Sequence, residues 1–254
     1  MSWSANQYSA FEDERTRPVR DLVARIPLPD ARIAVDLGCG PGNSTETLAA
    51  RFPGAAVTGL DNSEDMIAAA RKRLPSIQFD LADIATWDAP GPFDVILANA
   101  SLQWVPDHAT LYPRLVNKLS AGGVLAIQTP DNFGEPAHLL MRKVVTEGPW
   151  ADRLAAVRLK ARESANWYYE LLDPHCARLD IWRTTYFHRL KGGAADIVEW
   201  FKGSALRPFL DALDEADREP FLKRYQAAIA EAYPALPDGS VLLPFPRLFI
   251  VATR

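Results

Sequence analysis

Residues 36–42 read Asp-Leu-Gly-Cys-Gly-Pro-Gly and decide the fold of this 254-residue chain. A short apolar run at 32–37 precedes the glycines and is typical of a buried strand, while the spacing of apolar residues over 43–51 is that of a helix. Glycines at such a junction let the main chain turn sharply and let a ligand lie against it. The stretch therefore predicts a strand, a ligand-binding loop and a helix in succession.

The spacing of these glycines bears on the kind of ligand. Gly38, Gly40 and Gly42 follow G-x-G-x-G, whereas dinucleotide-binding loops follow G-x-G-x-x-G and phosphate-binding P-loops end in Gly-Lys-Ser/Thr. Both differences argue against a loop that cradles a pyrophosphate. An oxidoreductase that uses NAD is the disfavoured alternative, and a plain turn without a ligand is the simplest one.

Further strands and helices alternate after this loop. Apolar runs predict strands at 56–60, 77–79, 93–98 and 124–127. Helices are expected between them, one that starts at the N-cap Ser63 and one that starts at Pro106-Asp107. Gly122-Gly123 is expected to form the turn before the strand at 124–127. This alternation over residues 30–130 predicts a parallel sheet covered by helices on both faces.

The ends of the chain follow other patterns. Residues 9–25 are expected to form a helix with an apolar stripe of Val19, Leu22, Val23 and Ile26. Residues 136–172 and 194–233 are expected to be mostly helical, and 181–190 to be a strand. The helical stripe of the second region consists of Phe221, Leu222, Tyr225, Ala228, Ile229 and Ala232. A last strand at 241–251 contains Pro244 and Pro246, which indicates an edge position or an irregular start.

Composition narrows the class of protein. Hydrophobic residues make up 48% and charged residues 24%, the balance of a soluble globule, and the net charge of -4 disfavours nucleic acid as a partner. No long apolar window predicts a membrane span, and no signal peptide is evident, so the cytoplasm is expected. Cys39 and Cys176 form no disulfide framework, and the four histidines lack metal-ligand spacing, so no metal site is expected.

Polar residues at the predicted strand ends are candidate ligand contacts. Asp61 ends the second strand, where a carboxylate can accept both hydroxyls of a ribose, although a helix cap would look the same. Asp83-Ile84 suits an adenine, with a solvated loop as the alternative, and Asn99 ends the fourth strand, where it could instead cap a turn. The Cys39 thiol fits a small buried side chain better than a nucleophile, and His108 is expected on the surface.

Taken together, these motifs resemble the class I S-adenosylmethionine-dependent methyltransferases. The resemblance is closer to members that esterify a carboxylate of a small tricarboxylic acid. It rests on residues 34–45, 98–104, 180–186 and 245–251, and on Tyr8, Phe11, Arg15, Arg17 and Pro18 near the N-terminus. The resemblance implies one α/β domain over residues 1–254, with a doubly wound, mostly parallel seven-stranded sheet. It also implies a lid helix at 1–29, a cofactor-binding core at 30–130, a helical connection at 131–175 and a helical cap inserted at 191–238.

The resemblance also implies the site residues. S-adenosylmethionine, which leaves as S-adenosylhomocysteine, would contact Tyr8, Arg17, Gly38, Gly40, Gly42, Asp61, Asn62, Met66, Asp83, Ile84, Asn99 and Ala100. The carboxylates of a tricarboxylate need cations, and arginines form two parallel hydrogen bonds with a carboxylate, so the candidates for the acceptor are Arg15, Arg17, Arg142, Arg183, Arg207 and Arg247. Of these, Arg15, Arg183 and Arg207 are expected to contact the acceptor, together with Gln103 and Trp104. No general base is expected, because a carboxylate is already ionised at neutral pH. Another small carboxylate or an acyl-carrier thioester is the alternative acceptor, and a regulatory module that binds the cofactor without turnover is the alternative class.

Overall fold

The computed structural model describes residues 12–159 and 161–254, with side chains from residue 16 onward. The chain divides into two compact units. Unit 1 holds the chain up to Pro130 together with Glu163–Thr184 and Arg247–Arg254, and unit 2 holds Asp131–Arg162 and Thr185–Pro246. Among the described residues, no helix combines the length and the apolar character that crossing a membrane requires.

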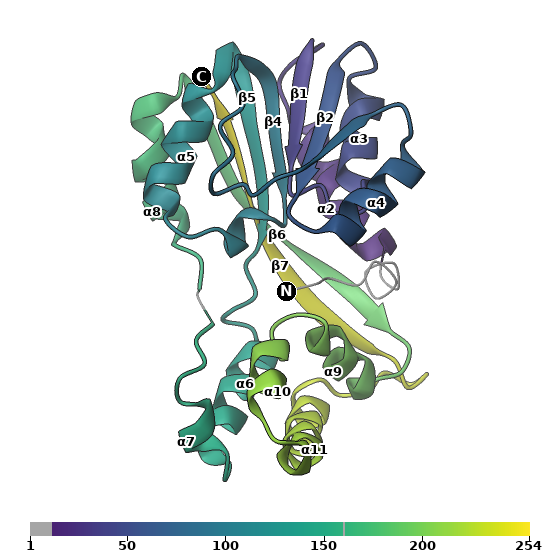
Figure 1. The fold of residues 1–254 in the computed structure, drawn as a ribbon. Helices are drawn as coiled ribbons and strands as arrows, with labels where there is room; N and C mark the ends of the chain where they lie inside the picture. The colour runs from purple at the N-terminus through teal and green to yellow at the C-terminus, as the bar shows by residue number, and fades with distance from the viewer. Residues whose placement is uncertain (1–11, 160) are drawn as a thin grey trace. The chain divides into compact units, whose positions relative to one another are not determined.

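A seven-stranded sheet in the order β3-β2-β1-β4-β5-β7-β6 is the framework of unit 1, and the second part of β6 and the first part of β7 belong to unit 2 (Figure 1). Its strands are β1 (Ile33–Leu37), β2 (Ala56–Asp61), β3 (Gln78–Leu81), β4 (Phe93–Asn99), β5 (Leu119–Pro130), β6 (Arg178–Leu190) and β7 (Val241–Thr253). Strands β1 to β5 pair in parallel, and β7 runs antiparallel to β5. The doubly wound, mostly parallel sheet expected from the sequence is confirmed, and its strand order reverses between β1 and β4.

Helices cover both faces of this sheet (Figure 1). One face carries α2 (Glu12–Ala24), α3 (Asn43–Arg51) and α4 (Glu64–Arg73), and the other carries α5 (His108–Asn117) and α8 (Ala165–Leu172). The expected stripe of α2 is buried, as are Tyr168 and Leu172 of α8, which join the core around β4 and β5. That apolar face explains why α8 belongs to unit 1. The helical connection at 131–175 that the resemblance implies stays a prediction.

One expectation about the last strands is wrong. Gly122 and Gly123 do not form a turn before β5 but lie inside it, where Gly122 has a φ of 76° and both residues pair with Arg254. For the prolines of β7 the sequence left an edge position or an irregular start, and the edge position is excluded because β5 and β6 flank the strand. Its prolines precede Arg247, where the pairing with β5 begins, so their missing N–H groups leave the β5 ladder intact.

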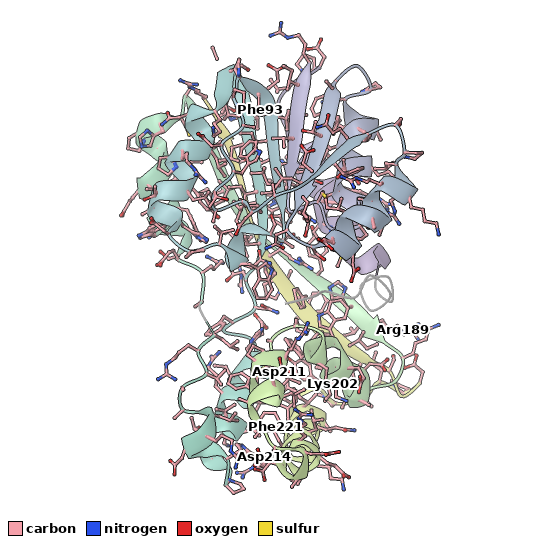
Figure 2. The ribbon with its side chains drawn as sticks, in the orientation of Figure 1. Phe93, Arg189, Lys202, Asp211, Asp214 and Phe221 are labelled. Atoms are coloured by element: carbon pink, nitrogen blue, oxygen red, sulfur yellow. The ribbon has the colours of Figure 1, made fainter. Side chains whose placement is uncertain are left out.

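Unit 2 is built mainly from helices (Figure 1). They are α6 (Pro136–Glu147), α7 (Ala151–Leu154), α9 (Ala194–Lys202), α10 (Arg207–Ala212) and α11 (Glu215–Ala232). Of the expected stripe on α11, Phe221, Tyr225 and Ile229 are fully buried (Phe221 is labelled in Figure 2). The Tyr225 hydroxyl donates to the carbonyl of Ala137 at 3.1 Å, so α11 is bonded to the first turn of α6.

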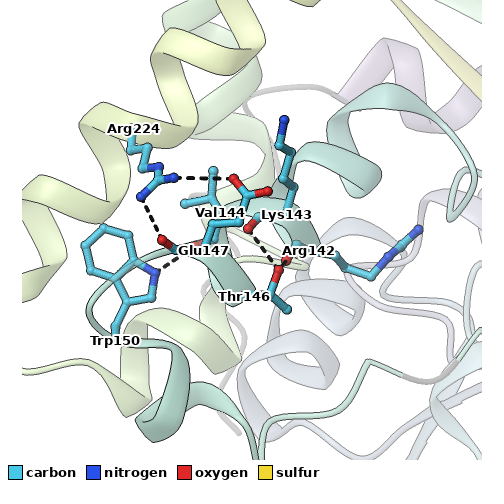
Figure 3. A network of polar contacts seen from close by, with 7 residues as sticks. All are labelled: Arg142, Lys143, Val144, Thr146, Glu147, Trp150 and Arg224. Atoms are coloured by element: carbon cyan, nitrogen blue, oxygen red, sulfur yellow. Dashed lines mark hydrogen bonds and ion pairs between the residues drawn. The ribbon is translucent and has the colours of Figure 1, made fainter.

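The far end of α6 is bonded to α11 as well (Figure 3). The Arg224 guanidinium donates to the carbonyl oxygen of Glu147 at 3.1 Å and lies 3.4 Å from its carboxylate. The indole N–H of Trp150 donates to the carbonyl of Val144 at 2.8 Å. Backbone acceptors at the end of a helix have no partner within the helix, so these side chains satisfy groups that would otherwise need water.

Gly59 on β2 offers a test of how tightly this sheet is packed. A Cβ at this position would lie 2.7 Å from the Phe79 ring and 3.1 Å from Cβ of Cys39, and both neighbours are buried. The substitution Gly59→Ala is expected to lower the free energy of unfolding by about 1–3 kcal/mol, which is the usual cost of overpacking. Urea denaturation followed by circular dichroism measures it.

Gly54→Ala is the matched control, because no described atom lies within 4 Å of the added methyl position. Its free energy of unfolding is expected to change by less than about 1 kcal/mol. A Gly59→Ala variant that unfolds at the same urea concentration as the control would contradict the crowding described for β2.

Candidate functional site

The loop after β1 exposes main chain at the carboxyl edge of the sheet. Gly38, Gly40 and Gly42 have φ angles of 75°, 54° and 94°, a region that favours residues without a Cβ. A Cβ on Gly38 would lie 2.4 Å from Cβ of Ser101, whereas a Cβ on Gly40 would meet no described atom within 4 Å. Close packing therefore requires glycine at 38, and the main chain of Gly40 borders open space.

Asp61 fixes this loop to the end of β2. Its Oδ2 accepts from the N–H of Gly40 at 3.0 Å, and its Oδ1 accepts from the N–H of Ser63 at 2.9 Å. Partial burial raises the pKa of Asp61, and the N–H groups of Ser63, Gly40 and Asn62 act in the opposite direction. An ionised carboxylate offers about four acceptor positions, so Asp61 can still accept hydrogen bonds from a ligand.

Asp36 is a fully buried carboxylate within β1. Its Oδ2 accepts from the hydroxyls of Ser44 and Thr45 on α3, at 2.6 and 2.7 Å, and its Oδ1 has no partner among the described residues. Burial raises the pKa of Asp36 to about 6 against the effect of the two hydroxyls, and the charge of Asp61 raises it further. A buried acceptor without a partner is costly unless a ligand supplies the donor.

The residues expected around an adenosine lie beside this loop. Ile84 is buried, and its Cδ1 would lie 3.3 Å from a Cβ on Gly38. Met66 is buried on α4, and Asn62 is exposed in the turn before that helix. Asp83 is exposed, and its Oδ1 accepts from the N–H of Ala85 at 2.8 Å. The loops after β1 and β3 therefore meet through Gly38 and Ile84.

The turn after β4 has an unusual backbone. Ala100 has a φ of 53°, in a region that residues with a Cβ rarely adopt. Its N–H donates to the carbonyl of Gln128 on β5 at 2.8 Å, and its carbonyl accepts from Nε2 of Gln103 at 2.7 Å. Strain of this kind persists where surrounding contacts hold it, and it is often found at functional sites.

This turn also carries acceptors without a partner. Oδ1 of Asn99 and Oε1 of Gln103 are buried and have no hydrogen-bond partner among the described residues. The Ser101 hydroxyl donates to the carbonyl of Leu37 at 2.6 Å, which joins the turn to the end of β1. Asn99 and Asp36 thus present unpartnered oxygens from the two strands between which the strand order reverses.

The expected acceptor contacts lie on several elements. Trp104 is exposed at the end of the short helix η1 (Leu102–Trp104), and Arg183 is exposed on β6 in unit 1. Arg207 begins α10 in unit 2, where its Nε lies 3.8 Å from Oδ2 of Asp211 (labelled in Figure 2). The structure thus does not place these three side chains on one element.

The expected contacts of the N-terminal segment are only partly described. Tyr8 lies outside the described residues. Arg15 belongs to α2, but its side chain is not described, and Arg17 is exposed on the same helix. Their roles therefore stay predictions.

The prediction for Cys39 is confirmed, whereas that for His108 is wrong. Cys39 is buried among Ile67, Ala70 and Phe79, and burial raises the pKa of its thiol far above the usual value, with the charges of Asp36 and Asp61 adding to the effect. The expectation of a small buried thiol is confirmed. The expectation that His108 lies on the surface is wrong, since its ring is buried and hydrogen-bonded at both nitrogens.

Sequence reasoning missed three polar residues that shape this edge, namely Asp36, Ser101 and Gln128. An acid within the apolar run of β1 and a glutamine after the apolar run of β5 were visible signals. Both side chains are buried, and a buried polar group in a strand needs a partner. Among the described residues, no group of three His, Cys, Asp or Glu side chains could hold a metal ion.

The arrangement can bind a small polar molecule that carries several hydrogen-bond donors. Main chain without side chains lies at Gly40, and carboxylate or amide oxygens lie on Asp36, Asp61 and Asn99. In open α/β sheets, ligands bind at the carboxyl ends of strands where the strand order reverses. The site occupies that place in unit 1.

Comparison with known proteins narrows the family. The methyltransferase domain family matches residues 34–123. A trans-aconitate 2-methyltransferase from Methylobacterium nodulans is 55% identical over 254 residues, covering 99% of this chain and 98% of its own. One from Rhizobium meliloti is 51% identical over 256 residues, covering 100% and 99%.

A solved structure shares the fold at low sequence identity. Coclaurine N-methyltransferase, solved with N-methylheliamine and S-adenosylhomocysteine, has a TM-score of 0.56 and 17% identity, covering 95% of this chain and 73% of its own. The likeness shows the fold alone, whereas the two relatives match at more than half of all positions along the whole chain. The chain belongs to the trans-aconitate 2-methyltransferase family.

Proposed function

We propose that this protein transfers a methyl group from S-adenosylmethionine to a carboxylate oxygen of trans-aconitate and releases the monomethyl ester. The observation that carries the proposal is the 55% identity over nearly the whole length of a relative named for this reaction. The hydrogen-bond acceptors at the carboxyl edge of the sheet support the proposal independently, because they suit a ligand with ribose hydroxyls and an amino group.

The residues present fit this cofactor. Gly40 offers open main chain for its amino-acid end, and the unpartnered Oδ1 of Asp36 can accept from its ammonium group. Asp61 can accept from the ribose hydroxyls, and Ile84 offers an apolar contact to the adenine. The remaining proposed cofactor contacts are Tyr8, Arg17, Gly38, Gly42, Asn62, Met66, Asp83, Asn99 and Ala100.

The proposed reaction needs side chains mainly to position the two ligands. When bound, the cofactor supplies a methyl group on a positively charged sulfur. The acceptor carboxylate has a pKa of about 4 and is ionised at neutral pH, so no residue has to remove a proton. The residues act by aligning the two ligands and by keeping water out, which favours a reaction that cancels charge. In well-aligned systems, alignment supplies up to ~7–11 kcal/mol.

The acceptor needs cations for its other carboxylates. Arginine suits this task because its planar fork forms two parallel hydrogen bonds with a carboxylate. We assign this role to Arg15, Arg183 and Arg207, with Gln103 and Trp104 lining the acceptor. The lid at 1–29 and the cap at 191–238 belong to the same hypothesis and stay predictions.

The first experiment asks which acceptor is used. Purified protein with S-adenosylmethionine and trans-aconitate is expected to release S-adenosylhomocysteine and a monomethyl ester, both identified by mass spectrometry. Citrate, cis-aconitate and a malonyl thioester serve as comparison acceptors. Faster turnover of one of these would replace trans-aconitate with that acceptor, and binding of the cofactor without turnover of any would indicate a binding module.

A second prediction concerns Asp61. Asp61→Ala is expected to weaken binding of S-adenosylhomocysteine by about ten- to a hundredfold, because hydrogen bonds to a charged group contribute about 1.5–3 kcal/mol. Isothermal titration calorimetry measures the dissociation constant. Asp65→Ala, which removes an exposed carboxylate from the first turn of α4, is the matched control and is expected to bind normally. Unchanged affinity in Asp61→Ala would remove the ribose role.

A third prediction concerns pH. Because burial raises the pKa of Asp36 to about 6, its carboxylate is mostly protonated at pH 5 and mostly ionised at pH 7. Only the ionised form attracts an ammonium group, so affinity for S-adenosylhomocysteine is expected to rise about tenfold between pH 5 and pH 7, with proton release on binding. Titration calorimetry at several pH values measures both.

Asp36→Asn is the control for this pH effect, since an amide can still accept from Ser44 and Thr45. This variant is expected to bind more weakly at pH 7 and to lose most of the dependence on pH. An equally steep dependence in Asp36→Asn would assign the effect to another group, such as Asp61.

A further inference from the structure

His108 joins three parts of unit 1. It is the first residue of α5, and its imidazole is buried. Its Nε2 lies 2.8 Å from the carbonyl oxygen of Leu102 in η1, and its Nδ1 lies 2.7 Å from the hydroxyl of Tyr168 on α8. A carbonyl oxygen only accepts, so Nε2 carries the proton, and in the neutral ring Nδ1 accepts from Tyr168.

Aromatic packing holds this imidazole in place. The centroid of the His108 ring lies 5.0 Å from that of Tyr112 and 5.8 Å from that of Tyr168, and the two tyrosine rings stack at 5.0 Å. Rotation of the imidazole would break both hydrogen bonds and both ring contacts. The direction of the Nε2–H bond is therefore set by the core.

The fixed bond acts on the peptide that precedes Gln103. The Leu102 carbonyl belongs to that peptide and also accepts from the N–H of Val105 at 3.0 Å, which closes η1. The Gln103 side chain in turn donates to the carbonyl of Ala100 at 2.7 Å. A series of hydrogen bonds thus runs from the core through His108 to the turn after β4.

The start of this turn, at Ala100 and Ser101, is held by hydrogen bonds of its own. The N–H of Ala100 and the hydroxyl of Ser101 are bonded to the carbonyls of Gln128 and Leu37, neither of which involves His108. The segment 102–104 has its own turn bonds, from Trp104 N–H to the carbonyl of Ser101 and from Val105 N–H to that of Leu102, and the bond from His108 is the one that joins it to α5. Loss of that bond should therefore disturb Gln103 and Trp104 more than Asn99 and Ala100.

We infer that His108 is a positioning residue for methyl transfer, which holds η1 so that Gln103 and Trp104 meet the acceptor. The inference rests on the proposed function, which places these two residues against the acceptor. It separates two effects, because the cofactor contacts at Asn99 and Ala100 keep their own anchors. Removing the imidazole should reduce use of the acceptor and leave affinity for the cofactor unchanged.

The test compares three variants with the wild type at 25 °C. His108→Phe keeps a ring but removes both hydrogen bonds, and His108→Gln restores an N–H that can reach the Leu102 carbonyl. Val116→Ala shortens a buried side chain two turns further along α5 and is the matched control for simple loss of stability. Each variant is measured by kcat/KM for trans-aconitate, the dissociation constant of S-adenosylhomocysteine, and hydrogen–deuterium exchange of a peptide that spans 102–105.

In His108→Phe, kcat/KM is expected to fall about five- to tenfold and exchange over 102–105 to accelerate by a similar factor, because only one of the two lost hydrogen bonds, that to the Leu102 carbonyl, reaches η1. Cofactor affinity should change less than twofold, His108→Gln should recover most of the loss, and Val116→Ala should behave as wild type in all three.

Wild-type kcat/KM or unchanged exchange in His108→Phe would overturn the inference. Equal losses in His108→Phe and Val116→Ala would do so too, because they would show a purely structural role. Absence of transfer to trans-aconitate in the wild type would reject the proposed function, and the exchange data would still decide whether His108 holds η1.

Discussion

The hydrogen bond from the Ser101 hydroxyl to the carbonyl of Leu37 is the contact on which the site depends. It joins the turn after β4 to the end of β1, the two strands between which the strand order reverses. It also brings Cβ of Ser101 to 2.4 Å from the position of a Cβ on residue 38, so that only glycine fits there. The positive φ angles of the loop and the unpartnered oxygens of Asp36 and Asn99 are found around this contact.

Local pattern was enough to predict the strands and helices of this region. Apolar runs gave β1 and β4 within about one residue, because parallel strands are buried on both faces and must be apolar. The place of Asp61 could be predicted as well, since it ends a strand beside a glycine loop and is bonded to Gly40 of that loop, and its contact with a ribose stays a prediction. The second half of the chain was harder to predict. Its sequence indicated helices but not that one of them, α8, would join the core of unit 1.

The errors have a common physical cause, which is pairing between distant residues. The Gly122-Gly123 pair looks like a turn, yet its partner is Arg254 at the other end of the chain. His108 follows a proline and an N-cap and so looks like a surface residue, yet Tyr168 and Leu102 supply partners for both ring nitrogens. No periodicity reports such contacts, and a buried polar side chain becomes favourable only when the fold supplies them.

The residues proposed to bind the cofactor and those proposed to bind the acceptor differ in charge. The loops after β1, β2, β3 and β4, at 38–42, 62–63, 82–92 and 100–107, contain no lysine or arginine. Arg114 of α5 does reach the loop after β3, where it donates to the carbonyls of Ile84 and Ala85, so the negative charge that favours a cation is local to Asp36 and Asp61 at the ends of β1 and β2. The arginines assigned to the acceptor stand instead on α2, β6 and α10. In the proposed reaction the positively charged sulfur would meet acids and the acceptor carboxylates would meet arginines, and the transfer cancels the charge on sulfur against that of one carboxylate.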